Sequence, residues 1–209
     1  MSINTIIIDI ETLDIDPTAV ILSIGAFAFD RFNLDETRKK IKISIDSQED
    51  ETPCFHMVCD ITNQIMLGKR TVSMGTLNWW RSQPDLVKNS FIFKCKKYHL
   101  ETVLMELNSK TEYWKKENKD IKFYFRGTDF DPVILKNALD EYNLQTPWKY
   151  YQVRDIRTYI DALTGGTKGY IEKNQPCFEM IKHNALHDAM NDAEQMCIAY
   201  NINKSFLNQ

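Results

Sequence analysis

The sequence predicts an α/β fold in which helices flank one mixed sheet of antiparallel and parallel strands. Three strand-like segments follow one another near the N-terminus, and strand patterns then alternate with helical patterns. The first run favours an antiparallel meander, and the later alternation favours parallel strands joined by helices. Because we find no internal repeat and no clear linker, we expect residues 1–209 to form a single domain.

The N-terminal segments are the expected meander. Residues 4–10 are mainly apolar, and residues 19–29 form a second apolar run after a turn signal at Pro17. Residues 40–46 alternate apolar and polar side chains, which is the pattern of a half-exposed strand. Residues 47–75 are polar with two glycines, and we expect a loop or a short helix there.

The second part of the chain carries helical and strand patterns in alternation. Thr76 is the expected cap of a helix that carries Trp79 and Trp80. The further expected elements are a helix at 98–117, a strand at 121–126, a helix at 132–142, a short strand or turn at 151–153, a helix at 156–163, a loop at 164–176 and a last helix at 185–201.

Composition and charge narrow the class of protein. The 209 residues are 43% apolar and 26% charged, as in an ordinary globular protein. The net charge of −3 is less basic than sequence-specific duplex binding usually requires, although it suits an enzyme whose acidic residues hold metal ions. Five scattered cysteines do not suggest a disulfide framework. Without a targeting segment or an apolar stretch long enough to span a membrane, a cytoplasmic protein is expected.

Asp9 and Glu11 lie at the end of the first expected strand. Residues i and i+2 of a strand point to the same face, with a rise of ~3.3 Å per residue, so the two carboxylates converge. Carboxylates this close repel each other unless a cation lies between them, and oxygen-only ligands favour Mg²⁺ or Mn²⁺. The pair alone is a weak signal, because solvated turn residues often have the same spacing.

Asp131 follows the strand expected at 121–126 and precedes Pro132. The position suits the N-cap of a helix with Pro at its first position. Capping occupies one carboxylate oxygen, so Asp131 can also bind a metal ion. Asp129 is the competing ligand, because its side chain is expected to point the opposite way.

The third group lies in the stretch His183-Asn-Ala-Leu-His-Asp188. On a continuous helix, residues five positions apart diverge by about 140°, so His183 and Asp188 would not meet. They can meet if Asn184 is the N-cap and His183 lies in the preceding loop. His187 and Asp192 share this spacing but lie inside the helix, and we therefore prefer His183 with Asp188.

The order of these groups resembles the DEDD exonucleases of the ribonuclease H-like fold, in the DEDDh subgroup that has His in the last motif. A resemblance covering most of the chain is to the exonuclease A group of T-even phages and, more loosely, to the mycobacterial ribonuclease AS group. It rests on residues 76–83, 126–131 and 154–158 together with the last motif, and it leans towards a phage origin.

The resemblance implies a ribonuclease H-like mixed sheet and a 3′–5′ exonuclease that releases nucleoside 5′-monophosphates. It implies Asp9, Glu11, Asp131 and Asp188 as ligands of two Mg²⁺ or Mn²⁺ ions, with His183 as general base. Two cations ~3.5–4 Å apart can clamp the attacking and leaving oxygens. An imidazole with a pKa near ~6.5 can accept the proton of a water molecule at neutral pH.

The expected partner is single-stranded or 3′-ended DNA or RNA. The nearer resemblance favours DNA and the looser one favours RNA. Candidate substrate contacts are Thr12, Leu13, Trp80 and Phe130. Because neighbours on a helix point about 100° apart, one of Trp79 and Trp80 can lie in the core while the other lines the cleft. Packing against the core is the competing explanation for both tryptophans.

Other charged and metal-binding residue types have structural alternatives. Asp155 can cap the helix at 156–163, and Arg157 can pair with a carboxylate or a phosphate. Cys54, His56 and Cys59 are zinc-type ligands, but a fourth ligand is missing. The following lysines form either a solvated helix face or a strip that guides phosphates: Lys94, Lys96, Lys97, Lys115, Lys116, Lys119 and Lys122.

Two other functions compete with the exonuclease. A catalytically silent nucleic-acid-binding module would keep the fold and lack an active-site carboxylate. A metal-dependent phosphatase or nucleotide hydrolase would release inorganic phosphate instead of a nucleoside monophosphate. The sequence also leaves a homodimer open.

Overall fold

The structure, a computed structural model, describes residues 3–46, 53–66, 69–89, 96–116, 118–166, 168–171 and 175–207. Its strands are β1 (Thr5–Thr12), β2 (Ile21–Phe29), β3 (Cys54–Cys59), β4 (Lys97–Tyr98), β5 (Lys122–Phe125) and β6 (Val153–Asp155). They form one sheet in the order β4-β3-β2-β1-β5-β6. β2 is antiparallel to both of its neighbours, whereas the other pairs are parallel.

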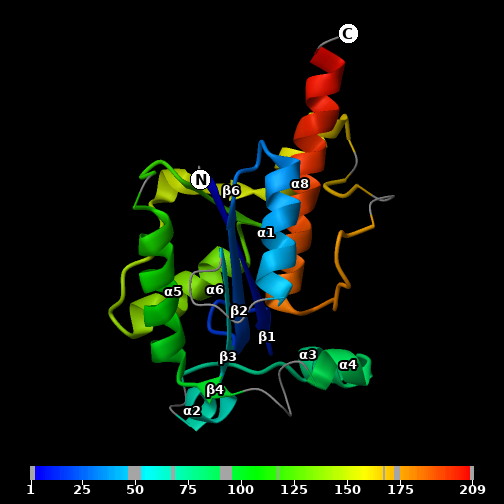
Figure 1. Ribbon diagram of the computed structural model, residues 1–209. Helices are drawn as coiled ribbons and strands as arrows, with labels where there is room; N and C mark the ends of the chain where they lie inside the picture. Colours follow the sequence, from blue (N-terminus) through cyan, green and yellow to red (C-terminus); the bar gives the residue numbers. More distant parts are fainter. Residues whose placement is uncertain are drawn as a thin grey trace.

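The helices are α1 (Leu34–Asp46), α2 (Ile61–Met66), α3 (Met74–Ser82), α4 (Asp85–Asn89), α5 (Leu100–Trp114), α6 (Asp131–Glu141), α7 (Ile156–Thr164) and α8 (Ala185–Leu207). One 3₁₀ turn, η1, covers Tyr150–Gln152. α5 and α6 cover one face of the sheet, while α1 and α8 lie on the other (Figure 1). The mixed sheet flanked by helices confirms the expected α/β, ribonuclease H-like class. Within the described ranges, no helix combines the length and hydropathy needed to cross a membrane.

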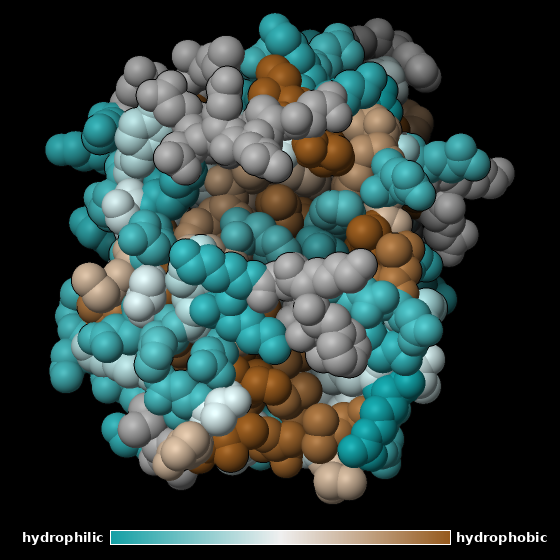
Figure 2. All heavy atoms as spheres, turned by 60° about the horizontal axis from the view of Figure 1, so that its bottom comes forward, coloured by the Kyte–Doolittle hydropathy of each residue, from teal (hydrophilic) through white to brown (hydrophobic). Residues whose placement is uncertain are grey.

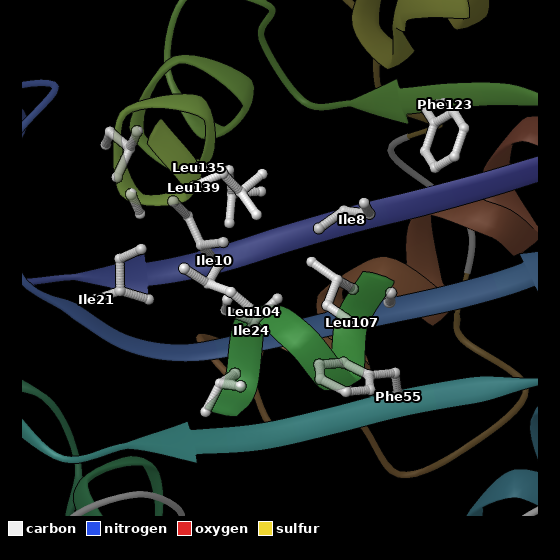
Figure 3. Close-up of a cluster of buried hydrophobic side chains, with 14 of the residues drawn as sticks. Ile8, Ile10, Ile21, Ile24, Phe55, Leu104, Leu107, Phe123, Leu135 and Leu139 are labelled. Atoms are coloured by element: carbon white, nitrogen blue, oxygen red, sulfur yellow. The ribbon is translucent and has the colours of Figure 1, made fainter. Parts of the chain in front are cut away.

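Alternating side chains of β1 serve the two faces of the sheet. Ile6, Ile8 and Ile10 pack with α5 and α6 in the larger hydrophobic cluster (Figure 3). Ile7 belongs instead to the cluster formed with α7 and α8. Each fully buried aliphatic side chain contributes roughly 1.5–3 kcal/mol to the stability of the fold. Since odd-numbered residues share the face of Ile7, Asp9 points towards α8.

The expected strand at 40–46 is wrong, because these residues are the second half of α1. Ile43 and Ile45 are exposed, whereas Ile41 is fully buried. The residues that face inwards follow helical spacing: Leu34, Thr37, Ile41 and Ser44. The Asn33 side chain accepts a hydrogen bond from the backbone N–H of Glu36, which is an N-cap that the local alternation obscured.

The third strand of the meander is β3, within the segment where we expected a loop or a short helix. It pairs with β2 from Ser23 opposite Val58 to Phe27 opposite Cys54. The short helix α2 follows it, and residues 47–52 and 67–68 of this segment lie outside the described ones. The meander expectation therefore holds for β1, β2 and β3, with α1 inserted before the third strand.

The later expected helices and strands are present, with shifted ends, whereas residues 167 and 172–174 of the expected loop lie outside the described ones. α3 begins at Met74, and Ser73 rather than Thr76 is its cap, because the Ser73 hydroxyl accepts the N–H of Thr76. Asp155 caps α7 as expected, through the N–H of Thr158. α8 extends to Leu207, beyond the expected end at 201.

α8 reaches the sheet at Gly25, directly beside Asp9. Gly25 is the partner of Asp9 in the β1–β2 ladder. A Cβ atom at Gly25 would lie 2.3 Å from the backbone carbon of Ala185 and from the backbone nitrogen of Leu186. Only glycine permits this approach, which brings the first turn of α8 over the end of β1.

Gly25→Ala is expected to push the start of α8 off the sheet. Forcing a methyl group into a filled space costs about 1–3 kcal/mol, so the melting temperature should fall by several degrees. Gly75→Ala is the matched control, because its Cβ would meet only the Ser73 hydroxyl at 3.5 Å and alanine favours a helix. Thermal unfolding checks both variants, and an unchanged transition for Gly25→Ala would contradict the packing argument.

Candidate active site

The site lies where β1 ends, between α8, α6 and α3. Asp9 and Glu11 share the α8 face of β1, and Glu11 is only 9% exposed. A β-bulge follows, since the pairing with β2 shifts between Glu11 and Thr12. Figure 2 turns this end of the molecule forward and shows a hollow near its centre, in which hydrophilic and hydrophobic residues meet.

Asp131 enters the site from the start of α6. The parallel pairing of β1 with β5 ends at Ile7 and Tyr124, so the backbone of Ile10 is free to bind elsewhere. The Asp131 carboxylate accepts the N–H of Ile10 and its own backbone N–H. Asp131 is 4% exposed, whereas Asp129 is exposed, which favours Asp131 over its competitor.

The prediction that Asp131 is the N-cap of this helix is wrong, because the helix begins one residue earlier than expected. The N-cap of α6 is Phe130, which makes no side-chain capping bond, and Asp131 already has helical geometry. Pro132 takes the second helical position and needs no N–H donor there. The Asp131 carboxylate is therefore held by the backbone N–H of Ile10 and by its own N–H, and it lines the larger of the cavities described below.

His183 and Asp188 meet through the turn that precedes α8. The Asn184 side chain accepts the N–H of His187, which makes Asn184 the N-cap as expected. His183 has a left-handed φ of 60°, an uncommon conformation for a residue other than glycine and one that clusters at functional sites. Its backbone N–H donates to the Asp188 carboxylate. Ligand atoms of Glu11, His183 and Asp188 all lie within 4.8 Å of one another.

His187, the alternative histidine, faces elsewhere. Its Nδ1 accepts the backbone N–H of Ile181 at 3.0 Å, and its ring contacts Phe178. It does not line either of the two cavities described below, whereas His183 does. The structure thus brings His183, and not His187, to the carboxylates.

Burial, and then neighbouring carboxylates, raise the pKa of all four carboxyl groups. Burial raises the pKa of Asp9 well above its usual value, and the charges of Asp131, Glu11 and Asp188 add to this effect. Glu11 behaves likewise, through burial and then Asp188 and Asp131. Burial raises the pKa of both Asp131 and Asp188 to about 7, against the opposing effect of their backbone N–H donors.

Hard divalent cations fit this donor set. In the described part of the chain, none of Asp9, Glu11, Asp131 and Asp188 forms a salt bridge with a basic side chain. Buried carboxylates of this kind need a counter-charge, and oxygen donors favour Mg²⁺ or Mn²⁺. Divalent ions are consistent with the cluster that Glu11, His183 and Asp188 form.

Asp192, one turn beyond Asp188, is neutralised by the protein itself. Arg126 Nε donates to its two carboxylate oxygens at 2.9 and 3.0 Å, and Arg126 Nη2 donates to one of them as well. Both side chains are largely buried. The pair supports α8 from the end of β5.

Trp79 and Trp80 divide their roles between the cleft and the core. Trp80 is 5% exposed, packs in a hydrophobic cluster with Leu13 and Val20, and donates its indole N–H to the Thr12 carbonyl at 2.8 Å. Trp79 is 42% exposed, and its ring centroid lies 4.8 Å from that of His183. The sequence singled out Trp80, but the accessible ring beside the histidine is that of Trp79.

Two cavities meet at the carboxylates. The smaller, about 350 Å³, is lined by Glu11, Thr12, Trp79, Trp80 and Phe130 among others. The larger, about 710 Å³, contains Asp9, Asp131, His183 and Asp188. Glu11 and Phe130 line both. Of the expected substrate contacts, Thr12, Trp80 and Phe130 line a cavity, whereas Leu13 is packed in the core.

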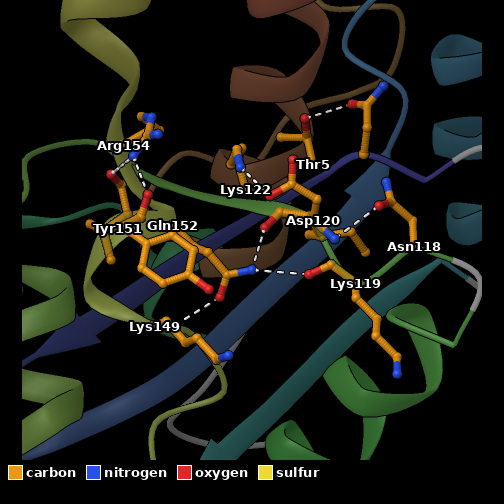
Figure 4. Close-up of polar contacts among 12 residues, drawn as sticks. Thr5, Asn118, Lys119, Asp120, Lys122, Lys149, Tyr151, Gln152 and Arg154 are labelled. Carbon is orange, nitrogen blue, oxygen red and sulfur yellow. Dashed lines mark hydrogen bonds and ion pairs between the residues drawn. The ribbon is translucent and has the colours of Figure 1, made fainter.

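Two other expectations have structural outcomes. Cys54 and Cys59 of β3 belong to hydrophobic clusters on opposite faces of the sheet, so they cannot share a zinc ion with His56. Lys119 and Lys122 lie at the edge of the sheet where β5 begins (Figure 4). β5 runs parallel to β1, so these lysines lie at the end of the sheet where both strands begin, whereas the carboxylates lie at the other end.

Four carboxylates and a histidine therefore converge at one end of this mixed sheet, an arrangement that can hold divalent ions beside a proton acceptor. The family model described as the 3′–5′ exoribonuclease Rv2179c-like domain matches residues 4–199. The chain belongs to this family, and it is a 3′–5′ exonuclease.

One solved structure is similar over nearly the whole chain. It is the nuclease domain of 3′hExo, a DEDDh family member, bound to rAMP. The two share 14% sequence identity with a TM-score of 0.47, covering 94% of this chain and 91% of that one. Comparison with curated proteins returned no match.

The raised carboxyl pKa values predict a metal-dependent pH profile of stability. Between about pH 6.5 and 8, the folded metal-free protein releases protons that the unfolded chain, with pKa values near ~4, has already lost. Stability should therefore fall as the pH rises through this window. His56, His183 and His187 act in the opposite sense at the lower end of this window, because their lowered pKa values make them bind fewer protons in the fold than in the unfolded chain, whose imidazoles have pKa values near ~6.5. This opposing effect has largely ended by pH 8, so the fall due to the carboxylates is clearest at the upper end of the window.

Thermal unfolding at pH 6.5 and 8, in EDTA and in Mg²⁺ or Mn²⁺, measures this effect. The metal ions should raise the melting temperature most at pH 8, because they neutralise the ionised carboxylates. Asp9→Asn should weaken Mn²⁺ binding in calorimetry and reduce the pH dependence. Unchanged Mn²⁺ affinity in Asp9→Asn would count against its role as a ligand.

Proposed function

We propose that this chain removes nucleotides one at a time from the 3′ end of RNA, releasing nucleoside 5′-monophosphates by two-metal catalysis. The observation that carries the proposal is the convergence of four buried carboxylates from β1, α6 and α8 beside His183. RNA is preferred because the family to which the chain belongs is described as exoribonucleases. DNA, favoured by the resemblance to the exonuclease A group, is the alternative to be tested.

Asp9, Glu11, Asp131 and Asp188 would hold the two ions. When bound, such ions neutralise the carboxylates, activate water and stabilise the negative charge that develops on the scissile phosphate. The carboxylates come from three elements that the packing of α8 on the sheet holds together. Their backbone N–H donors, from Ile10 and His183, fix the orientation of Asp131 and Asp188.

His183 is suited to accept the proton of the attacking water. Burial and the nearby charge of Lys182 lower its pKa, so the imidazole is neutral at pH 7 and can accept a proton. The water oxygen attacks phosphorus, and the bond to the 3′-oxygen of the penultimate nucleotide breaks. The departing 3′-oxygen takes up a proton from solvent to become a 3′-hydroxyl, while the phosphate leaves with the terminal nucleoside as its 5′-phosphate.

The smaller cavity is suited to the terminal nucleoside. It is lined mainly by apolar and aromatic side chains, and Trp79 offers an accessible ring. Stacking on such a ring contributes roughly 1–3 kcal/mol per base and tolerates any base. The contact of the Trp79 ring with the His183 ring also limits where the imidazole can move.

His183→Ala is expected to lower turnover by roughly 10²–10⁴-fold while metal binding changes little, because only the proton acceptor is lost. His187→Ala is the matched control from the same turn, and it should retain far more activity. Steady-state kinetics and Mn²⁺ calorimetry measure the two effects. Full activity of His183→Ala would show that another group accepts the proton.

Digestion of 5′-labelled oligonucleotides tests the reaction itself. Matched RNA and DNA, single-stranded and duplex, are incubated with Mg²⁺, Mn²⁺ or EDTA. A ladder that shortens from the 3′ end, stops in EDTA and releases nucleoside monophosphate is expected, faster with RNA. Faster digestion of DNA would reverse the sugar preference, and release of inorganic phosphate would indicate a phosphatase.

A further inference from the structure

The carboxylates lie between the two cavities, and the larger cavity has a wall of basic side chains. Arg126, Arg157 and Lys182 line it, together with Tyr170. None of the described residues that line the smaller cavity is basic. The two sides of the carboxylate cluster therefore differ in charge, and the cationic side suits a phosphate.

Arg126 is already committed to protein partners. It binds Asp192 through a bidentate ion pair, donates from Nη1 to the Gly169 carbonyl at 3.1 Å and lies over the Tyr170 ring. Its guanidinium is buried within these contacts. The exposed arginine of this wall is Arg157.

Arg157 lies in a slot that two glycines keep open. A Cβ atom at Gly169 would come within 2.5 Å of the Arg157 Cβ, and one at Gly127 within 3.0 Å of its Nη1. Both glycines have positive φ, of 76° and 119°. Nη1 donates to the Arg126 carbonyl at 2.6 Å, so the guanidinium is held in place while the rest of its donors remain available.

Arg157 faces the site without forming an ion pair there. Among the described residues, no carboxylate lies within salt-bridge distance of its guanidinium. It lines the same cavity as Asp131 and Asp188, which places it beside the carboxylate cluster. A fixed, exposed guanidinium of this kind is well suited to bind a phosphate with two hydrogen bonds.

The polarity of the reaction identifies which phosphate this is. A 3′-terminal nucleoside carries no phosphate beyond the scissile one, so only the chain on the 5′ side supplies further phosphates. Given the proposed function, on which this step rests, we infer that Arg157 binds the phosphate on the 5′ side of the penultimate nucleotide. The enzyme then holds its substrate across both cavities. In a dinucleotide, the shortest substrate, this phosphate is the 5′-terminal one, so its presence should raise kcat/KM.

Two dinucleotides that differ only in this phosphate test the inference. The wild-type enzyme should cleave 5′-phosphorylated pNpN with a kcat/KM about 10- to 100-fold above that of NpN, the range of one charge-assisted hydrogen bond. Arg157→Ala should lose this preference, so that its kcat/KM values for pNpN and NpN become equal, and Arg157→Lys should restore part of it. Most of the change should appear in KM.

Arg154→Ala is the matched control. Arg154 is exposed and only three residues away, and its Nη1 donates to the carbonyls of Tyr151 and Val153 instead of facing the cavity. It should keep the wild-type preference for pNpN. Thermal unfolding of each variant shows whether the substitution has changed the stability of the protein.

A longer oligonucleotide with one uncharged methylphosphonate at the same linkage, on a 2′-deoxyribose, extends the test. Release of its terminal nucleotide should slow about 10- to 100-fold in the wild type, and Arg157→Ala should show no further loss. Cleavage of both dinucleotides at equal rates, or an equal loss on both in Arg157→Ala, would overturn the phosphate contact alone. No cleavage of any substrate with either metal would overturn the proposed exonuclease as well.

Discussion

The close packing of α8 against β2 at Gly25 is the contact on which the site depends. Gly25 lies beside Asp9 in the sheet, and its missing side chain lets the backbone at Ala185 approach the strand. The first turn of α8 therefore lies over the end of β1, with Asp188 opposite Asp9 and Glu11. A helix held one side chain further away would leave the carboxylates too far apart to share ions.

This packing concentrates negative charge in a buried place, and the fold compensates only part of it. Arg126 neutralises Asp192, and backbone N–H groups of Ile10 and His183 bind Asp131 and Asp188. Nothing comparable neutralises the whole cluster within the described residues, and the raised pKa values express that deficit. The protein thus keeps a concentration of carboxylates that divalent cations would neutralise, so the proposed binding of ions would be coupled to the stability of the site.

The surroundings of the carboxylates are asymmetric in a way that matches a nucleic-acid end. Trp79 and Phe130 offer apolar surface on one side, and Arg157 offers a fixed cation on the other. A terminal nucleoside has a base and no further phosphate, whereas the rest of the strand is a polyanion. The bulge after Glu11 and the left-handed turn at His183 shape the boundary between these two sides.

The sequence by itself predicted the sheet class and the five residues that the structure brings together, because strand periodicity and the cap at Asn184 are local features. It misassigned residues 40–46, where alternating isoleucines imitate a strand, and it favoured Trp80 over Trp79. Those choices depend on which side of a helix meets the core, and local spacing does not contain that information. Only the tertiary structure decided that Gly25 admits α8 and that Gly127 and Gly169 open a slot for Arg157, because these contacts join segments far apart in the chain.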